Sequence, residues 1–144
     1  MIPVLSEENI VLNAKLKNKE EAIRYTGQIL VNNGYVEQEY IEKMLEREEL
    51  TSTYMGNFVA IPHGTEDAKS AVRSPGISIV LAPDGVDFGN GNIAKVLIGI
   101  AGKNNEHLEI LSQIAIVCSE EENVTDMIHA KSAEEILSLF NEVN

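Results

Sequence analysis

The chain has 144 residues, the usual size of one domain, and 44% of them are hydrophobic, which is enough to bury a core. Its formal net charge of -12, from 23 acidic and 11 basic residues, opposes binding to nucleic acid and to anionic membrane surfaces. We therefore expect a single domain over residues 1–144 whose macromolecular partners carry basic patches.

Cysteine usage and hydrophobicity both point to the cytoplasm. Cys118 is the single cysteine, so it cannot form a disulfide within the chain, and no cysteine–histidine cluster has metal-ligand spacing. Residues 1–10 lack the charged start and apolar core of a signal peptide, and no apolar run approaches the ~18 residues of a membrane span. We expect a cytoplasmic protein without direct membrane insertion.

The first third of the chain predicts a short strand and two helices. Ile10-Val11-Leu12 is apolar, as in an N-terminal strand or an extended arm on the core. Asn18 is the predicted N-cap of a helix that stops at Asn33-Gly34. A second helix spans Glu37 to about Arg47, with these apolar residues on one face: Val36, Tyr40, Ile41, Met44 and Leu45. Arg47 therefore falls near the C-terminal end of that helix.

Three apolar runs predict strands: Phe58 to Ile61, Gly76 to Ala82 and Ala94 to Ala101. The last two runs are apolar at successive positions, which is typical of strands that helices cover on both faces. Turn residues lie between them at Pro83-Asp84-Gly85 and Gly89-Asn90-Gly91-Asn92. Such connections are too short for a helical crossover, so these two strands should pair antiparallel.

Three helices follow the strands. Asn104-Asn105 is predicted to cap a helix that runs to about Cys118, with apolar positions at Leu108, Leu111, Ile114, Ala115 and Cys118. A shorter helix spans Asn123 to Ala130, and Ser132 with Glu135 forms a capping box for the last one. This order of elements predicts an α/β fold, a single-domain sandwich with a central mixed β-sheet flanked by helices on both faces.

His63 stands where the run Phe58 to Ile61 stops. Pro62 has no N–H to continue a sheet, so the histidine falls on a corner between strand and loop. Gly64 has no side chain to crowd the imidazole, which leaves room for a phosphate or a second molecule's backbone. The alternative is an ordinary turn histidine.

The other two histidines have different surroundings. His107 lies in the first turn of a predicted helix, where unpaired backbone N–H groups favour an anion, although a helix-edge histidine bonded to a carbonyl fits the same position. His129 lies in an acidic helical segment and is interpreted as a solvated surface residue.

The residue types favour histidine as a nucleophile. Two histidines without a third ligand make a weak zinc site, and the chain has no GxSxG, Walker A or GxGxxG motif. A neutral imidazole accepts a phosphoryl group on one nitrogen when a hydrogen bond holds the N–H of the other. Arg47 and His107 are the donors available to stabilise that group, and an arginine near His63 would disfavour its protonation. The alternative for Arg47 is a helix C-terminal cation paired with Glu46 or Glu49.

Three segments carry a resemblance to a known family. They are Arg47-Glu48-Glu49-Leu50-Thr51, Ala60-Ile61-Pro62-His63-Gly64-Thr65, and Ile98-Gly99-Ile100-Ala101 with Asn104-Asn105-Glu106-His107-Leu108. Together they closely resemble the mannitol-type enzyme IIA of the bacterial phosphoenolpyruvate-dependent sugar phosphotransferase system, from Leu5 to the last helix. The resemblance implies a phosphotransferase component that forms a phosphohistidine on Nε2 of His63, with His107 and Arg47 beside it and no metal or organic cofactor.

The resemblance also implies partners. The phosphocarrier protein HPr donates the phosphoryl group, and a cysteine of mannitol enzyme IIB, alone or in an IICB transporter, receives it during mannitol uptake. Met55, Phe58 and Ile61 are the apolar residues expected to form a rim around the histidine. One alternative is a regulatory module of the same fold, like the nitrogen-related enzyme IIA proteins, whose phosphorylation state controls partner proteins. A histidine-based hydrolase or metal enzyme is another.

Overall fold

The two most apolar segments form the longest strands, β4 (Gly76–Asp87) and β5 (Ile93–Ala101). They pair antiparallel, with Gly76 opposite Ala101. The connecting loop turns at Gly89, Asn90 and Gly91, whose φ angles of 111°, 56° and 78° suit glycine and asparagine. The computed structural model describes residues 3–140, apart from the side chains of 104–107, and confirms the predicted antiparallel pair.

Three short strands complete a mixed sheet in the order β1-β4-β5-β3-β2. β1 (Ile10–Val11) lies parallel to β4, which confirms the predicted N-terminal strand. β3 (Val59–Ala60) lies parallel to β5, and β2 (Tyr54–Gly56) pairs antiparallel with β3. β2 has no counterpart among the predicted strands, because three residues ending in glycine are too short to show alternation.

β4 continues through Pro83-Asp84-Gly85 to Asp87, so the predicted turn there is wrong. The register with β5 shifts between Leu81 and Val86, and Gly85 has a φ of +85°. The segment is therefore a bulge, which bends a strand without ending it. A bulge also tolerates proline, whose missing N–H would interrupt a regular ladder.

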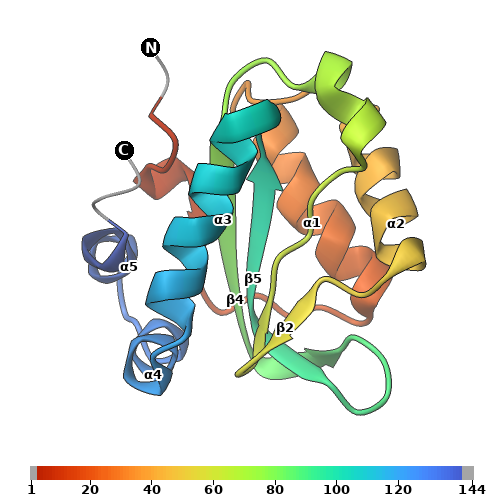
Figure 1. Ribbon diagram of the computed structural model, residues 1–144. Coiled ribbons are helices and arrows are strands. Elements are labelled where there is room, and N and C mark those ends of the chain that lie inside the picture. Colours follow the sequence, from red (N-terminus) through yellow and green to blue (C-terminus); the bar gives the residue numbers. More distant parts are fainter. Residues whose placement is uncertain (1–2, 141–144) are drawn as a thin grey trace.

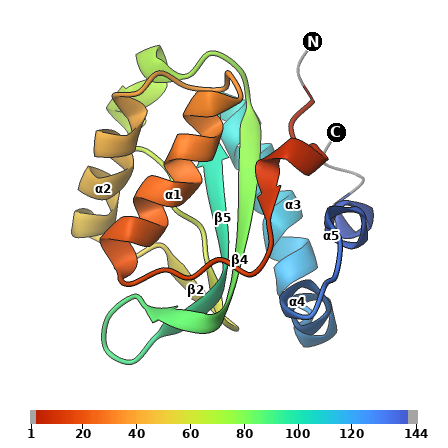
Figure 2. The ribbon, with the colours of Figure 1, turned by 180° about the vertical axis from the view of Figure 1, so that it is seen from behind.

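Helices cover both faces of the sheet, as predicted (Figure 1). Two lie on one face: α1 (Lys19–Asn32) and α2 (Tyr40–Leu50). Three lie on the other: α3 (Asn104–Cys118), α4 (Glu121–Ile128) and α5 (Ala133–Leu139), as the reverse view also shows (Figure 2). Along β5, Ile98 packs towards α3–α5 and Leu97 towards α1 and α2. This alternation explains why the central strands are apolar at successive positions.

Several helix ends follow the predicted signals. The Asn18 side chain accepts a hydrogen bond from the Glu21 N–H at 2.9 Å, which confirms the cap of α1. The Ser132 hydroxyl accepts from the Glu135 N–H at 3.4 Å at the start of α5, but the Glu135 carboxylate bonds the N–H of Lys131. The serine half of the predicted capping box is present, whereas the Glu135 side chain bonds the N–H of the residue before Ser132 and not that of Ser132 itself.

Other helix boundaries differ from the predictions. α2 begins at Tyr40 and not at Glu37, and the Glu37 N–H donates to the Ala71 carbonyl at 2.8 Å. Ala71 ends η2 (Glu66–Ala71), a 3₁₀ segment, and a second one, η1 (Glu7–Asn9), precedes β1. α3 is preceded by Lys103 as its N-cap residue, so the predicted asparagine cap is wrong.

The buried face of α3 agrees with the predicted apolar positions in part. Ile114 and Cys118 are buried and Leu111 is half-buried, as expected, whereas Leu108 is 61% exposed, Ala115 is exposed and Ile110 is buried instead. Because leucine, isoleucine and valine occur around most of this helix, its sequence pattern does not specify one buried side. Within residues 3–140, no helix combines the length and hydrophobicity needed to cross a bilayer.

Candidate active site

His63 is fastened to the carboxyl end of β5. Among the described residues every peptide bond is trans, including the one between Ile61 and Pro62. His63 forms a single parallel bridge with Ile100, and the Ile100 N–H donates to the Pro62 carbonyl at 2.9 Å. The histidine is thus half-buried on a backbone that β5 holds in place.

The imidazole has a defined tautomer. Nδ1 of His63 lies 2.7 Å from the Ile61 carbonyl oxygen. A carbonyl oxygen only accepts hydrogen bonds, so Nδ1 carries the proton and donates it. In the neutral ring the nucleophilic lone pair is therefore on Nε2.

The surroundings of His63 favour the neutral ring. Burial lowers the pKa of His63 most, and the positive charge of Arg47 lowers it further. The hydrogen bond to Ile61 and the negative charge of Glu48 act in the opposite direction, and the pKa remains below its usual value of about 6.5. The ring is accordingly unprotonated, and nucleophilic, at neutral pH.

Arg47 lies in the last turn of α2, and its positive charge acts on His63. Its Nη1 donates to the Thr51 carbonyl at 2.8 Å, which satisfies a peptide group beyond the helix end. Of its two predicted acidic partners, Glu46 is instead paired with Lys43 at 3.4 Å. A guanidinium has five N–H donors, so the bond to Thr51 is compatible with binding an anion.

The sheet brings the segment carrying His107 to the same edge as His63. β3 and β5 are adjacent and parallel, so their carboxyl ends lie together. His63 follows β3, and His107 lies in the first turn of α3, which follows β5. The His107 side chain lies outside the described residues, so the expected pairing of the two rings stays a prediction.

Tyr40 is a residue of this site that was predicted only as part of an apolar helix face. Its hydroxyl donates to the Ile100 carbonyl at 2.7 Å and accepts from the Gly64 N–H at 2.9 Å. A Cβ at Gly64 would lie 2.7 Å from Cε1 of Tyr40. The tyrosine ring therefore occupies the space that the absence of a side chain at position 64 was expected to leave for a phosphate.

Glu48 is a second residue that the sequence did not single out. It is only 5% exposed, and its carboxylate accepts bonds from the Thr53 N–H at 3.0 Å and hydroxyl at 2.5 Å. The Thr53 carbonyl in turn accepts from the Ile61 N–H at 3.0 Å. Tyr40, at one end of α2, and Glu48, near the other, thus support the two sides of the His63 segment. Their spacing of eight residues is typical of one helix face, but the same spacing occurs between ordinary core residues, so the sequence pattern does not mark them as site residues.

The expected apolar rim is wrong for Phe58. Its carbonyl accepts from the N–H groups of Lys95 and Val96, whereas His63 bridges Ile100. Four residues along a strand correspond to about 13 Å, so Phe58 lies well away from the histidine. Met55 and Phe58 are exposed, as predicted, but Ile61 is half-buried and packs on the core beneath α3.

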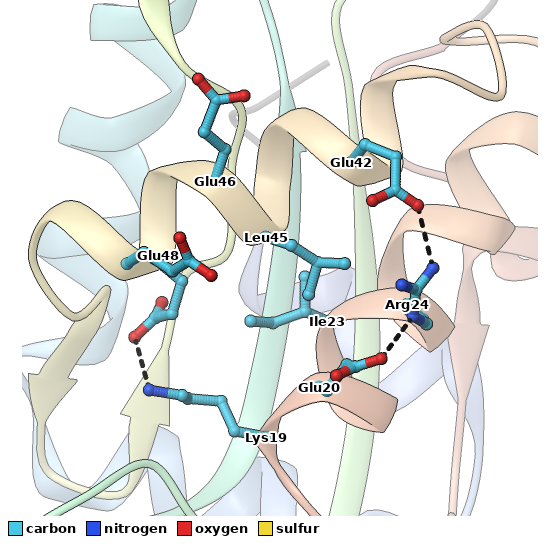
Figure 3. A pocket seen from close by; sticks show the side chains of 9 residues that line it. Lys19, Glu20, Ile23, Arg24, Glu42, Leu45, Glu46 and Glu48 are labelled. Atoms are coloured by element: carbon cyan, nitrogen blue, oxygen red, sulfur yellow. Dashed lines mark hydrogen bonds and ion pairs between the residues drawn. The ribbon is translucent and has the colours of Figure 1, made fainter.

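A polar hollow of about 540 Å³ lies between α1 and α2 (Figure 3). Its acidic lining residues are Glu20, Glu42, Glu46, Glu48 and Glu49. Arg24 pairs with Glu20 at 3.0 Å and Glu42 at 3.3 Å, and Lys19 with Glu48 at 3.7 Å. Among the side chains that the structure describes, no three histidine, cysteine or acidic groups lie as a metal site requires. Glu48, which bonds Thr53 beside the histidine segment, also lines this hollow.

Comparisons with known proteins relate this chain to one family. Residues 3–143 match the family described as "Phosphoenolpyruvate-dependent sugar phosphotransferase system, EIIA 2". The chain is 73% identical to the mannitol-specific phosphotransferase enzyme IIA component of Geobacillus stearothermophilus over 99% of each chain. The crystal structure of IIA mannitol from Escherichia coli is 43% identical, with a TM-score of 0.89, over 94% of this chain and 98% of that one. The Escherichia coli IIA in complex with phosphorylated enzyme IIB of the mannitol system is 40% identical, with a TM-score of 0.89, over 96% and 97%.

Proposed function

We propose that this chain, which belongs to the EIIA 2 family of the phosphoenolpyruvate-dependent sugar phosphotransferase system, is a phosphoryl carrier that uses His63. The observation that carries the proposal is the 2.7 Å hydrogen bond from Nδ1 to the Ile61 carbonyl. It keeps the proton on Nδ1 and directs the Nε2 lone pair away from the backbone that holds the ring. The lowered pKa of His63 supports the same role, because an imidazolium has no lone pair to donate.

The transfer takes place in two displacements at phosphorus. Nε2 of His63 attacks the phosphoryl group of phosphorylated HPr, and the N–P bond forms as the bond to the donor breaks. A cysteine thiolate of enzyme IIB then attacks the same phosphorus, and the N–P bond breaks to regenerate the neutral ring. In both steps the proton stays on Nδ1, hydrogen-bonded to the Ile61 carbonyl, so Nε2 accepts and releases the phosphoryl group without a change in the protonation of Nδ1.

The sugar is proposed to be mannitol. Support comes from the relative at 73% identity, which is named as mannitol-specific, and from the Escherichia coli complex, which pairs an enzyme IIA of this fold with mannitol enzyme IIB. The acceptor is accordingly the IIB cysteine of a mannitol transporter.

Arg47 and His107 are proposed to stabilise the transferred group. Phosphoryl transfer spreads negative charge over three oxygens, so fixed donors and cations lower its barrier. Arg47 supplies a cation whose charge already acts on His63. His107 belongs to the helix start at the same edge of the sheet.

The test is phosphorylation with phosphoenolpyruvate, enzyme I and HPr, followed by intact-mass analysis. We expect wild type to gain one phosphoryl group, ~80 Da, and His63→Ala to gain none. His129→Ala is the matched control, because His129 is an exposed histidine whose Nδ1 also bonds a carbonyl, that of Thr125 at 2.9 Å. A wild type that gains no mass would overturn the carrier role.

A second step separates transport from regulation. Phosphorylated protein is mixed with purified mannitol enzyme IIB, and the mass of both chains is followed. Loss of ~80 Da from this chain with a gain on the IIB cysteine supports the transport role. Stable phosphorylation without transfer would instead favour a regulatory module.

A further inference from the structure

A buried tyrosine of α2 bonds two backbone segments of the histidine site, the loop after His63 and the strand β5. Tyr40 is 2% exposed, and its hydroxyl bridges the Gly64 N–H at 2.9 Å and the Ile100 carbonyl at 2.7 Å. Gly64 is the residue after His63, and Ile100 is the β5 residue that pairs with His63. One side chain thus fastens the loop and the strand that hold the imidazole.

The Tyr40 ring also limits what residue 64 can be. The three atoms nearest to a Cβ built on Gly64 all belong to Tyr40, at 2.7 Å, 2.9 Å and 3.1 Å. Gly64 does not have a positive φ, so its backbone would accept alanine. Contact with the tyrosine ring is therefore the physical reason for glycine at this position.

The Tyr40 hydroxyl keeps the same donor and acceptor roles at any working pH. Burial raises the pKa of Tyr40 to about 12, so the hydroxyl retains its proton. It therefore always donates to the carbonyl of Ile100, which cannot donate, and always accepts from the N–H of Gly64. A hydroxyl with both bonds satisfied by backbone groups has a fixed orientation.

We propose that Tyr40 is a positioning residue for His63: by bridging Gly64 and Ile100 it holds the loop against β5 and sets the direction of Nε2. The proposal rests on phosphoryl transfer at His63. Tyr40 reaches the reacting atoms only through the loop, whose placement decides how well Nε2 meets the phosphorus. Misplacing a reacting group by about 1 Å costs up to roughly 100-fold in rate.

The experiment compares Tyr40→Phe with Tyr35→Phe. Tyr35 is the matched control because it is 1% exposed and its hydroxyl also donates one bond, to the Pro3 carbonyl at 2.6 Å, and accepts one, from the Asn9 side chain at 2.8 Å. Both substitutions remove a buried hydroxyl with two bonds, so general loss of stability affects them alike. They differ in their contact with the His63 loop.

Two readouts distinguish positioning from stability. We expect Tyr40→Phe to lower kcat for phosphorylation by about 10- to 100-fold, with KM for phosphorylated HPr within about twofold. We also expect it to move the NMR-measured pKa of His63 towards its usual value of about 6.5, because a loosened loop exposes the ring. Tyr35→Phe should change neither quantity.

A second variant tests the ring contact. Gly64→Ala places a methyl group against Tyr40 and should also lower kcat and shift the His63 pKa, since the loop must move to admit it. The positioning role is overturned if Tyr40→Phe matches Tyr35→Phe in both readouts. If wild type accepts no phosphoryl group, the carrier function fails, and the NMR comparison by itself decides whether Tyr40 positions His63.

Discussion

The reactivity of His63 depends on a peptide group two residues before it. The Ile61 carbonyl accepts the Nδ1–H at 2.7 Å and so assigns the lone pair to Nε2. The Ile61 N–H is itself held by the Thr53 carbonyl at 3.0 Å. At the scale of single residues, the site is a ring whose tautomer is set by an anchored backbone.

The lowered pKa of His63 predicts its pH dependence. Because the folded chain binds this proton less readily than the unfolded chain, stability is lost as pH falls from about 6.5 towards the lower folded pKa. Over the same window the ring stays nucleophilic, so the phosphorylation rate should hold down to pH 6.5 and fall with a midpoint below it. NMR titration of His63 checks this, with the urea-unfolded chain as control. A folded midpoint at or above that of the unfolded chain would contradict it.

Arg47→Ala should slow phosphorylation by about 100-fold, the usual effect of losing one preorganised charge donor. It should also raise the pKa of His63, because the arginine charge lowers it. Single-turnover rates and NMR titration measure the two effects. Arg73→Ala is the control, since Arg73 is an exposed arginine paired with Glu37. Equal results for the two variants would remove Arg47 from the site.

At the scale of elements, α2 supports the site from one face. Arg47 and Glu48 follow Tyr40 by seven and eight residues, which places the three within one broad stripe of the helix, about 100° wide. Tyr40 fastens the loop after His63, and Glu48 fastens Thr53, which holds Ile61. The helix therefore determines where the histidine segment lies on β5.

Glu48→Ala should lower the free energy of unfolding by about 2–4 kcal/mol, because it leaves the buried Thr53 N–H and hydroxyl without their acceptor. Urea denaturation measures the change. Glu49→Ala, an exposed neighbour on the same helix, is the control and should change stability by less than about 0.5 kcal/mol. A loss of similar size in both variants would argue against the Glu48–Thr53 link as a special contact.

At the scale of the whole molecule, the net charge of -12 should govern the encounter with partners. Complementary charge speeds association, and salt screens it over about 10 Å at 0.1 M. We expect KM for phosphorylated HPr to rise several-fold between about 0.05 and 0.5 M salt, with kcat nearly constant. Steady-state kinetics in salt, with sucrose as an uncharged control, test this. A KM independent of salt would show that net charge does not guide docking.

Several features could be predicted from the sequence, because local patterns encode them. Consecutive apolar residues predicted the central strands, because alternate side chains serve the two helical layers. Asn18 and Ser132 predicted helix starts, since a cap is a contact over three residues. The Ile-Pro-His-Gly-Thr segment placed a histidine at a strand end, where the structure has it.

Other features depend on contacts between distant residues and could not be predicted from local patterns. Tyr40 meets Ile100 across 60 positions, so nothing in the pattern of α2 separates this hydroxyl from an ordinary core tyrosine. The strand through Pro83-Asp84-Gly85 exists because β5 pairs beyond the bulge, where turn chemistry alone predicts an end. Local patterns report the conformations that nearby residues favour. Which surfaces meet, and so which peptide groups orient His63, follows from the packing of the whole chain.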